Sequence, residues 1–294
     1  MNLVVGATGE LGGEICRQLA AKGKPVRALV RAASDPAKVE ALRALGAEIV
    51  QGDLRDRASL DAACRGVSAV ICTVTSVFRY QPGENDLQTV DTEGVANLIH
   101  AAKAAKVPHL VYTSFSGQIN IPCPLESAKR AVEGRLKASG LTYTILRPSY
   151  FMESWLSPAI GFDGVNAKAT IYGDGQSPIS WISRYDVARF AVASLDNPAA
   201  RNATLELGGP EALSPFDVVR IFEQVGGRSF EVQHVPVEAL QAQQEAATDG
   251  LQQSFSALMR AYAQGDAIDM RQTLQAFPLK LMTVREYAQR VLGA

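Results

Sequence analysis

The chain has 294 residues, 47% of them hydrophobic and 20% charged, which is typical of a globular protein with one large domain or with a core domain and a smaller companion. Its net charge of −1 provides no basic excess for binding nucleic acid. No apolar run approaches the roughly 18 residues that a membrane-spanning helix needs. We therefore expect neither a nucleic acid nor a membrane as a partner.

Cysteine and histidine usage indicates the cellular setting and argues against a metal site. None of the cysteines forms a C-x-x-C pair, and free thiols of this kind suit a reducing compartment. The first residues read as a strand that enters a turn rather than as a secretory leader, so we expect a cytoplasmic protein. No two histidines stand at metal-ligand spacing, and we expect no metal. The residues concerned are Cys16, Cys64, Cys72, Cys123, His100, His109 and His234.

The first half of the chain alternates short apolar segments with helical patterns. We expect strands at residues 2–5, 25–30, 47–53, 69–74, 109–114 and 142–148. We expect helices at about residues 13–22, 36–45, 58–66, 91–107 and 126–139, with a long polar loop at 76–89. Strands that alternate with helices at this spacing predict a parallel sheet covered on both faces.

The pattern changes after Pro148. Residues 149–180 are rich in Gly, Pro, Ser and aromatic residues and look irregular, a helix returns at about 184–196, and a strand follows at 204–209. The remainder reads as helices with a short strand at 230–236. We predict an α/β fold, a Rossmann-type doubly wound parallel sheet at residues 1–149 to which 179–209 return. Residues 150–178 and 210–294 would form a smaller substrate-binding part.

The sequence GATGELG places Gly6, Gly9 and Gly12 at three-residue spacing, directly after the first strand and at the start of the first helix. Glycine permits the positive φ of a sharp turn and lets a pyrophosphate approach the backbone closely. The helix N-terminus then offers unpaired N–H groups and a partial positive charge to the phosphates. This position favours a dinucleotide-binding turn over the alternative, a plain glycine-rich turn.

The second strand ends at Arg31, 19 residues after Gly12. NAD-selective sites carry an acid at about this distance, which accepts a hydrogen bond from the ribose 2′-OH, but here the first acid is Asp35. A guanidinium suits a 2′-phosphate instead. We predict NADP(H) as the preferred cofactor, with NAD(H) as a second option. Asp53 ends the third strand, where it would accept from the adenine amino group or cap a helix.

Several segments carry a family resemblance. They are GATGELG, VRALVR, QGDL, VDTEGVANLIHAAKAAKVPHLVYTS, SGLTYTILRPSYFMES, YGDGQSPISWISRYDVARFAVASLDNP and LELGGPEALSP. Together they resemble the NmrA-like branch of the short-chain dehydrogenase/reductase superfamily, which includes isoflavone-reductase-like enzymes and NAD(P)H-dependent quinone reductases. The resemblance covers roughly residues 1–225.

The resemblance implies a cofactor site along the strand ends and beside the sixth strand, where Pro148, Ser149, Tyr150 and Phe151 would flank the nicotinamide. The remaining implied cofactor residues are Gly6, Thr8, Gly9, Glu10, Leu11, Gly12, Arg31, Asp53, Leu54, Thr73, Val74, Thr113, Ser114 and Lys129.

The superfamily's catalytic Y-x-x-x-K pair is incomplete in this chain. Lys129 matches the lysine, but Leu125 stands where the tyrosine acid is expected. Lys129 would bind the ribose hydroxyls, or donate a proton if its pKa is lowered. Ser114 would bind a substrate oxygen, and Tyr80 or Tyr150 would replace the missing acid; a turn cap and aromatic packing are the alternatives for these residues.

Two functions from different classes fit these residues. The first is an NADPH-dependent reductase of a small hydrophobic carbonyl, quinone or enone, for which the apolar residues after the sixth strand would line the pocket. The second is a non-catalytic NADP(H)-binding sensor, regulator or assembly factor, which the missing tyrosine favours. We expect a monomer or a homodimer in either case.

Overall fold

The computed structural model describes residues 1–293, which form two compact units. The first unit comprises Met1–Ser114, Ser127–Leu146 and Val187–Leu205. The second comprises Phe115–Glu126, Arg147–Asp186 and the residues from Glu206 onward. Each unit is therefore assembled from segments that are distant in the sequence.

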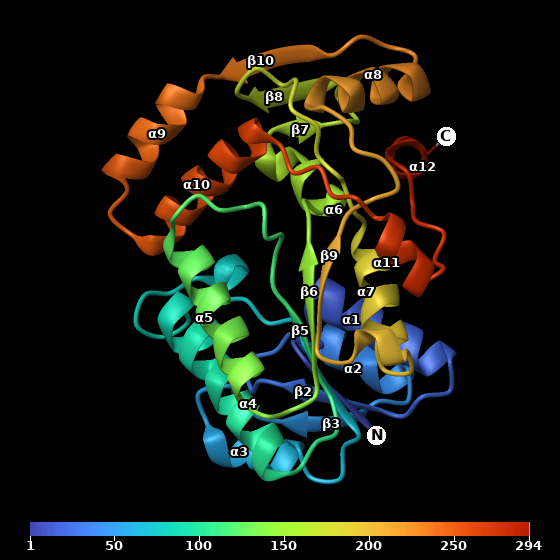
Figure 1. Ribbon diagram of the computed structural model, residues 1–294. Helices are drawn as coiled ribbons and strands as arrows, with labels where there is room; N and C mark the ends of the chain where they lie inside the picture. The colour runs from blue at the N-terminus through green and yellow to red at the C-terminus, as the bar shows by residue number, and fades with distance from the viewer. Residues whose placement is uncertain (294) are drawn as a thin grey trace. The chain divides into compact units, whose positions relative to one another are not determined.

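A seven-stranded sheet organises the first unit (Figure 1). Its strands are β1 (Asn2–Val5), β2 (Val26–Val30), β3 (Glu48–Gln51), β4 (Ala69–Cys72), β5 (Leu110–Thr113), β6 (Tyr143–Pro148) and β9 (Ala203–Leu207). They follow the order β3-β2-β1-β4-β5-β6-β9, and β1 to β6 pair in parallel. The strand order reverses beside β1, and ligands of such sheets bind outside the carboxyl ends of the strands at this point.

Helices cover both faces of this sheet, with α1, α2 and α7 on one side and α3, α4 and α5 on the other (Figure 1). This confirms the predicted Rossmann-type α/β fold. The helical elements are α1 (Glu10–Ala21), α2 (Pro36–Ala44), α3 (Arg57–Ala63), the 3₁₀ turn η1 (Val77–Arg79), the π-helix η2 (Leu87–Gly94), α4 (Val95–Ala104), α5 (Pro124–Ala138), α7 (Arg184–Ala193) and the 3₁₀ turn η4 (Pro198–Ala200).

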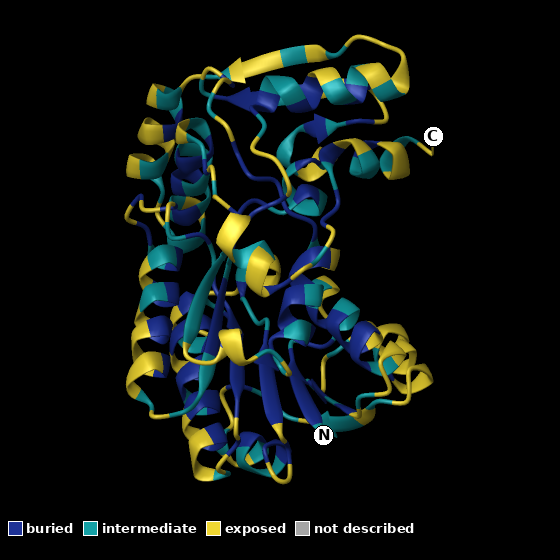
Figure 2. Cartoon of the chain, turned by 45° about the vertical axis from the view of Figure 1, so that its right-hand side comes forward, coloured by how far each residue is buried: buried dark blue, intermediate teal, exposed yellow. Residues whose placement is uncertain are grey.

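The central strands β1, β4 and β5 are buried along their whole length, because helices pack on both of their faces (Figure 2). Alternate side chains of these strands belong to one apolar cluster with residues of α3 and α4, including Leu60 and Leu98. Leu54 also lies in this cluster and is 6% exposed. A rigid, dry core of this kind holds the strand ends, and the polar residues that follow them, in fixed positions.

Two expectations about secondary structure need correction. The π-helix η2 (Leu87–Gly94) replaces the end of the loop predicted at 76–89 and the first residues of the helix predicted from residue 91. Asp86 caps it by accepting from the backbone N–H groups of Gln88 and Thr89. Residues 149–180 are also more regular than expected, because they contain two strands that pair with one another.

The second unit contains a small three-stranded sheet in the order β10-β8-β7. Its elements are α6 (Met152–Trp155), the 3₁₀ turn η3 (Pro158–Ile160), β7 (Phe162–Asp163), β8 (Lys168–Tyr172), α8 (Pro215–Gly226), β10 (Glu231–Val235), α9 (Val237–Ala246), α10 (Gly250–Gln264), α11 (Arg271–Ala276) and α12 (Val284–Leu292). The strand expected at 230–236 is β10. Within residues 1–293, no helix combines the length and apolarity needed to cross a membrane.

Candidate functional site

The glycine turn joins β1 to α1 and leaves room for a ligand. Gly6 has φ +91°, a conformation that L side chains rarely adopt, and its carbonyl accepts from the N–H of Gly9 at 2.9 Å. A Cβ at Gly12 would stand 2.1 Å from the same carbonyl, so Gly12 allows α1 to pack against the turn. A Cβ at Gly9 would approach Gly6 O only to 3.2 Å. Gly9 is thus not required by the fold in the way that Gly12 is.

The first turn of α1 has the features of a phosphate-binding N-terminus. Gly9 is its N-cap residue and provides no side chain to satisfy the first N–H groups. Thr8 and Leu11 are half-buried, and Gly9 and Glu10 are exposed. Unsatisfied N–H groups and the helix dipole favour an anion here, so the residues present fit the pyrophosphate of a dinucleotide.

Arg31 follows β2, and its guanidinium is held by a neutral partner. Its Nη1 donates to Oδ1 of Asn85 at 3.0 Å. Asp35, the first acid after β2, caps α2 by accepting from the N–H of Ala37 at 2.9 Å. No carboxylate in residues 1–293 forms an ion pair with Arg31. Arg31 acts electrostatically on the Asp53 carboxylate, but no ion pair occupies its guanidinium, whose remaining N–H groups are available to an anionic ligand.

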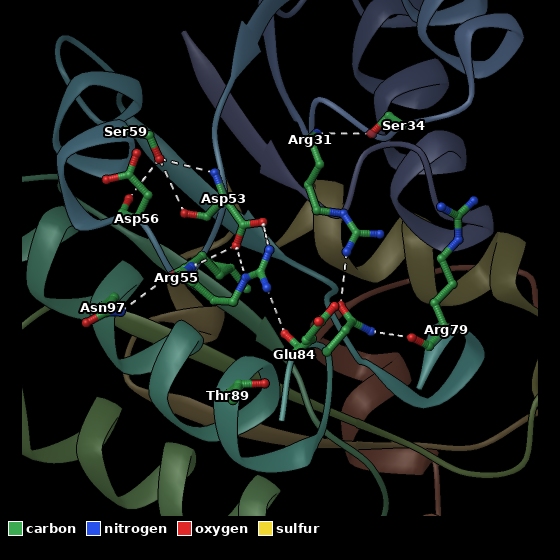
Figure 3. A network of polar contacts seen from close by, with 12 residues as sticks. Arg31, Ser34, Asp53, Arg55, Asp56, Ser59, Arg79, Glu84, Thr89 and Asn97 are labelled. Carbon is green, nitrogen blue, oxygen red and sulfur yellow. Dashed lines mark hydrogen bonds and ion pairs between the residues drawn. The ribbon is translucent and has the colours of Figure 1, made fainter. Parts of the chain in front are cut away.

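Asp53 follows β3, and Arg55 occupies both of its carboxylate oxygens (Figure 3). The Arg55 Nε to Asp53 Oδ1 distance is 2.9 Å, and the Nη2 to Oδ2 distance is 2.8 Å. The hydrogen bonds from Arg55 hold the pKa of Asp53 below its ordinary value. An adenine amino group would have to share this carboxylate with Arg55, which the sequence analysis did not single out.

Lys129 lies on α5 in a buried ion pair. It is 5% exposed, and its Nζ lies 3.2 Å from Asp91 Oδ1 and 3.3 Å from the carbonyl oxygen of Val74. Its Nζ also lies 5.5 Å from the ring centroid of Tyr112. Burial favours the neutral amine, but Tyr112 and Asp91 outweigh it and raise the pKa of Lys129 above its ordinary value. Lys129 is therefore an ammonium at neutral pH.

Asp91 is the residue that holds Lys129, and the sequence analysis missed it. It lies on the π-helix η2 and is fully buried. Its Oδ2 accepts from the backbone N–H of Ser76 at 2.8 Å and from the Ser76 hydroxyl at 2.6 Å. Single π-helical turns occur frequently at functional sites, and this one brings a carboxylate to the candidate lysine.

The ends of β4 and β5 contribute further polar atoms. Thr73 Oγ1 donates to Val5 O at 3.3 Å. Thr113 Oγ1 is buried and has no hydrogen-bond partner in the part of the chain that the structure describes. The Ser114 hydroxyl accepts from Arg130 Nη1 at 3.4 Å. The unpaired Thr113 hydroxyl fits a site that a ligand completes, because buried polar groups are rarely left without partners.

Tyr150 follows β6 and belongs to the second unit, together with Pro148, Ser149 and Phe151. Its hydroxyl donates to the carbonyl oxygen of Leu258 at 3.0 Å, and its ring packs edge-on against Trp155 at 4.7 Å. Burial, with Asp266 and Tyr262 close by, raises the pKa of Tyr150 well above its ordinary value. Tyr80, the other candidate acid, follows η1 and is half-buried.

The second unit also contains a buried carboxyl group that no sequence pattern indicated. Asp266 is fully buried, and its Oδ1 accepts from the Ser116 hydroxyl at 2.8 Å. Its Oδ2 and the Ser149 hydroxyl have no hydrogen-bond partner among the described residues. Burial raises the pKa of Asp266, although the hydrogen bond from the Ser116 hydroxyl partly offsets it.

In the first unit, the predicted residues that end or follow β1, β2, β3, β4 and β5 come together at the carboxyl ends of parallel strands. These are Gly6, Arg31, Asp53, Thr73, Val74, Thr113 and Ser114. Such an edge, with a glycine turn and a cation after β2, defines a dinucleotide-binding α/β protein. Within residues 1–293, no group of His, Cys, Asp or Glu is placed to hold a metal ion.

Comparison with known proteins places the chain in a family. The chain matches the NmrA-like family over residues 2–288 and belongs to it. It is 32% identical to the photosystem II assembly factor Ycf39 of Trieres chinensis, over 80% of this chain and 72% of that protein. It is also 32% identical to the NAD(P)H azoreductase of Xenophilus azovorans, over 88% of this chain and 85% of that protein.

A solved structure extends the similarity to the whole fold. The NADPH-dependent quinone oxidoreductase QOR2 of Escherichia coli, in complex with NADPH, is 25% identical to the chain with a TM-score of 0.80, and the match covers 99% of both chains. The predicted membership of the NmrA-like branch is thus confirmed. The relatives include NAD(P)H reductases and an assembly factor, so the family alone leaves both functional hypotheses open.

Proposed function

We propose that this protein is an NADPH-dependent reductase that transfers a hydride to a small hydrophobic carbonyl, quinone or enone acceptor. The observation that carries the proposal is Arg31, a cation with no carboxylate partner at the end of β2, in the same unit as the glycine turn. The similarity to an NAD(P)H azoreductase and to an NADPH-dependent quinone oxidoreductase supports it.

The chain's own residues would bind the cofactor in three places. The glycine turn and the N-terminus of α1 would hold the pyrophosphate, and Arg31 would pair with the 2′-phosphate through charge-assisted hydrogen bonds. Lys129, fixed by Asp91, would donate to the nicotinamide ribose hydroxyls. The bound cofactor would supply the hydride, and the protein would supply position and electrostatics.

Lys129 serves better as a positioning cation than as the acid in this proposal. A general acid works best when its pKa lies near the working pH, but Asp91 and Tyr112 raise the pKa of Lys129. Ser114 is the candidate for binding the acceptor oxygen. Tyr80 and Tyr150 are the candidates for the missing acid, and the Tyr150 hydroxyl donates to Leu258 O.

A second candidate function is a non-catalytic NADP(H)-binding regulator or assembly factor. Leu125 in place of the tyrosine acid favours it, as does the similarity to an assembly factor. Both functions require the same cofactor-binding residues. They differ in whether bound NADPH is consumed, so turnover is the property that separates them.

An acceptor screen tests the proposal. Purified protein would be mixed with NADPH and a panel of quinones, enones, aldehydes and azo dyes, and both cofactor oxidation and reduced product would be measured. We expect turnover with at least one class. The Lys129→Met variant should lose more in kcat than in NADPH affinity, because a misplaced nicotinamide slows hydride transfer more than the loss of one ribose contact weakens binding. Tight NADPH binding without oxidation by any acceptor would support the regulator instead.

A further inference from the structure

A small hairpin lies between β4 and the π-helix η2. Gln81 and Asn85 form a two-residue antiparallel bridge, with N–H to carbonyl distances of 2.9 and 2.8 Å. Gly83 turns the chain with φ +78°. Asp86 accepts from the N–H of Gly83 at 2.6 Å and also caps η2, so it joins the hairpin to the helix that carries Asp91.

Two arginines from the ends of neighbouring strands donate to consecutive residues of this hairpin. Arg55 Nη1 donates to the carbonyl oxygen of Glu84 at 2.8 Å, and Arg31 Nη1 donates to the side chain of Asn85 at 3.0 Å. Figure 3 shows Arg31 and Arg55 entering this network from two sides. Both accepting oxygens are neutral, so neither of these hydrogen bonds pairs an arginine with a carboxylate.

The two arginines differ in their remaining partners. Asp53 pairs with Arg55 through both carboxylate oxygens, so the charge of Arg55 is largely compensated. Arg31 has no such partner among residues 1–293, and its Nε and Nη2 groups donate to no atom there. Arg31 therefore keeps N–H groups in two directions that are suited to a phosphate.

The orientation of the Asn85 amide is fixed by a second hydrogen bond. Its Nδ2 donates to the carbonyl oxygen of Arg79 at 2.6 Å, which directs Oδ1 toward Arg31. The side chain is 9% exposed and is therefore held in place by its surroundings. A carboxylate at this position would instead form an ion pair with Arg31 and repel an approaching phosphate.

We propose that Asn85 is a specificity-determining residue, which positions Arg31 for the 2′-phosphate of NADP(H) while leaving its charge available. The inference rests on the proposed function, in which NADPH is the cofactor. It adds to that proposal the residue that allows Arg31 to select NADP(H) over NAD(H). It predicts that cofactor choice depends on the uncharged state of a side chain that lies 54 residues from Arg31 in the sequence.

Binding of two cofactor fragments tests this role without relying on turnover. Calorimetry would measure the affinity of adenosine 2′,5′-bisphosphate and of adenosine 5′-monophosphate for wild type, Asn85→Asp, Asn85→Ala and Gln81→Glu. Gln81→Glu adds the same charge to an exposed position of the same hairpin. Circular dichroism would check that each variant is folded.

We expect Asn85→Asp to lower the affinity for the bisphosphate by about 10- to 100-fold, which corresponds to the loss of one charge-assisted contact. The affinity for the monophosphate should stay nearly unchanged. Asn85→Ala should weaken the bisphosphate less, because Arg31 keeps its charge but loses its support. Gln81→Glu should leave the ratio of the two affinities unchanged.

The inference is overturned if Asn85→Asp and Asn85→Ala keep the wild-type ratio of bisphosphate to monophosphate affinity. The same holds if a substitution lowers both affinities equally, since Asn85 would then only stabilise the hairpin. A wild type that does not distinguish the fragments also overturns it. A third outcome separates the two proposals. If the wild type prefers the bisphosphate and Asn85→Asp shows the expected loss, but none of the acceptors tested leads to NADPH oxidation, the reductase proposal fails and the role of Asn85 stands.

Discussion

The Asp91→Asn substitution removes the carboxylate that faces Lys129 while keeping the size of the side chain. The Lys129 ammonium would then be left with an uncharged acceptor, Val74 O at 3.3 Å, in a place where its side chain is 6% exposed. Removing one partner of a buried ion pair typically costs about 3–5 kcal/mol.

Lys129 has one alternative, which is to lose its proton. Deprotonating a lysine with the ordinary pKa of 10.5 at pH 7 costs about 1.4 kcal/mol for each of about 3.5 pH units, or about 5 kcal/mol. Both routes therefore predict that the free energy of unfolding falls by about 3–5 kcal/mol, a large share of the 5–15 kcal/mol that is usual for folded domains.

The pH dependence of the variant provides a signature of this mechanism. Without Asp91, the remaining partner Tyr112 is an uncharged phenol at these pH values, because burial raises its own pKa. Burial then lowers the pKa of Lys129 in the folded state below its unfolded value, so the unfolded state binds more protons and stability rises with pH. In the wild type the pKa of Lys129 is raised, so its stabilising contribution is present below the unfolded pKa and is lost only as pH rises through the folded pKa. The variant alone should gain stability between about pH 7 and pH 9.5.

Urea unfolding followed by circular dichroism at these two pH values measures the effect. Glu40→Gln is a matched control, because it breaks the Arg43–Glu40 pair, whose side chains are 57% and 70% exposed, and should cost about 0–1 kcal/mol. An Asp91→Asn protein within about 1 kcal/mol of the wild type at pH 7, with no gain at higher pH, would refute the reasoning.

Four further substitutions provide tests. Gly9→Val should fold, because its Cβ meets Gly6 O at 3.2 Å and a small shift relieves this contact, but its side chain should block the binding of NADPH. Gly12→Val should not fold, since a Cβ there meets Gly6 O at 2.1 Å. Circular dichroism and cofactor fluorescence decide this, and tight NADPH binding by Gly9→Val would place the phosphates elsewhere. Arg31→Ala should lower the affinity for NADPH by about 10- to 100-fold and change the affinity for NADH little. If a calorimetric titration finds that the wild type binds NADPH and NADH equally well, Arg31 does not select between the two cofactors. Burial raises the pKa of Asp266, so its contribution to stability is full below the unfolded pKa and lost as pH rises through the folded pKa; Asp266→Asn should therefore stabilise the protein at pH 7 and not near pH 4, and thermal melts with the same gain at both would contradict this.

The features that local sequence determines were predictable. The apolar run AVIC at residues 69–72 is buried on both faces and forms β4 as expected. The glycine turn is also local, because Gly6 and Gly12 meet within one turn of chain. Arg31 was predicted from its distance to the glycines, since both follow neighbouring strands of a parallel sheet.

The partners of these residues could not be predicted, because they come from distant segments. Asn85 meets Arg31 across 54 residues, and Asp266 meets Ser116 across 150. Asp91 was missed for another reason. VDTEGV reads as the start of an ordinary helix, and periodicity alone does not reveal that a π-helix turns this carboxylate toward Lys129.

Single-turnover oxidation of NADPH by a quinone or enone, compared with NADPH deuterated at the transferring carbon, tests the central claim most directly. We expect the nicotinamide absorbance to decay in one enzyme-dependent phase, and deuteration to slow this phase. The Lys129→Met variant should reduce the rate of this phase by a larger factor than it reduces the affinity for NADPH. A wild type that binds NADPH tightly and shows no oxidation with any acceptor would contradict the account.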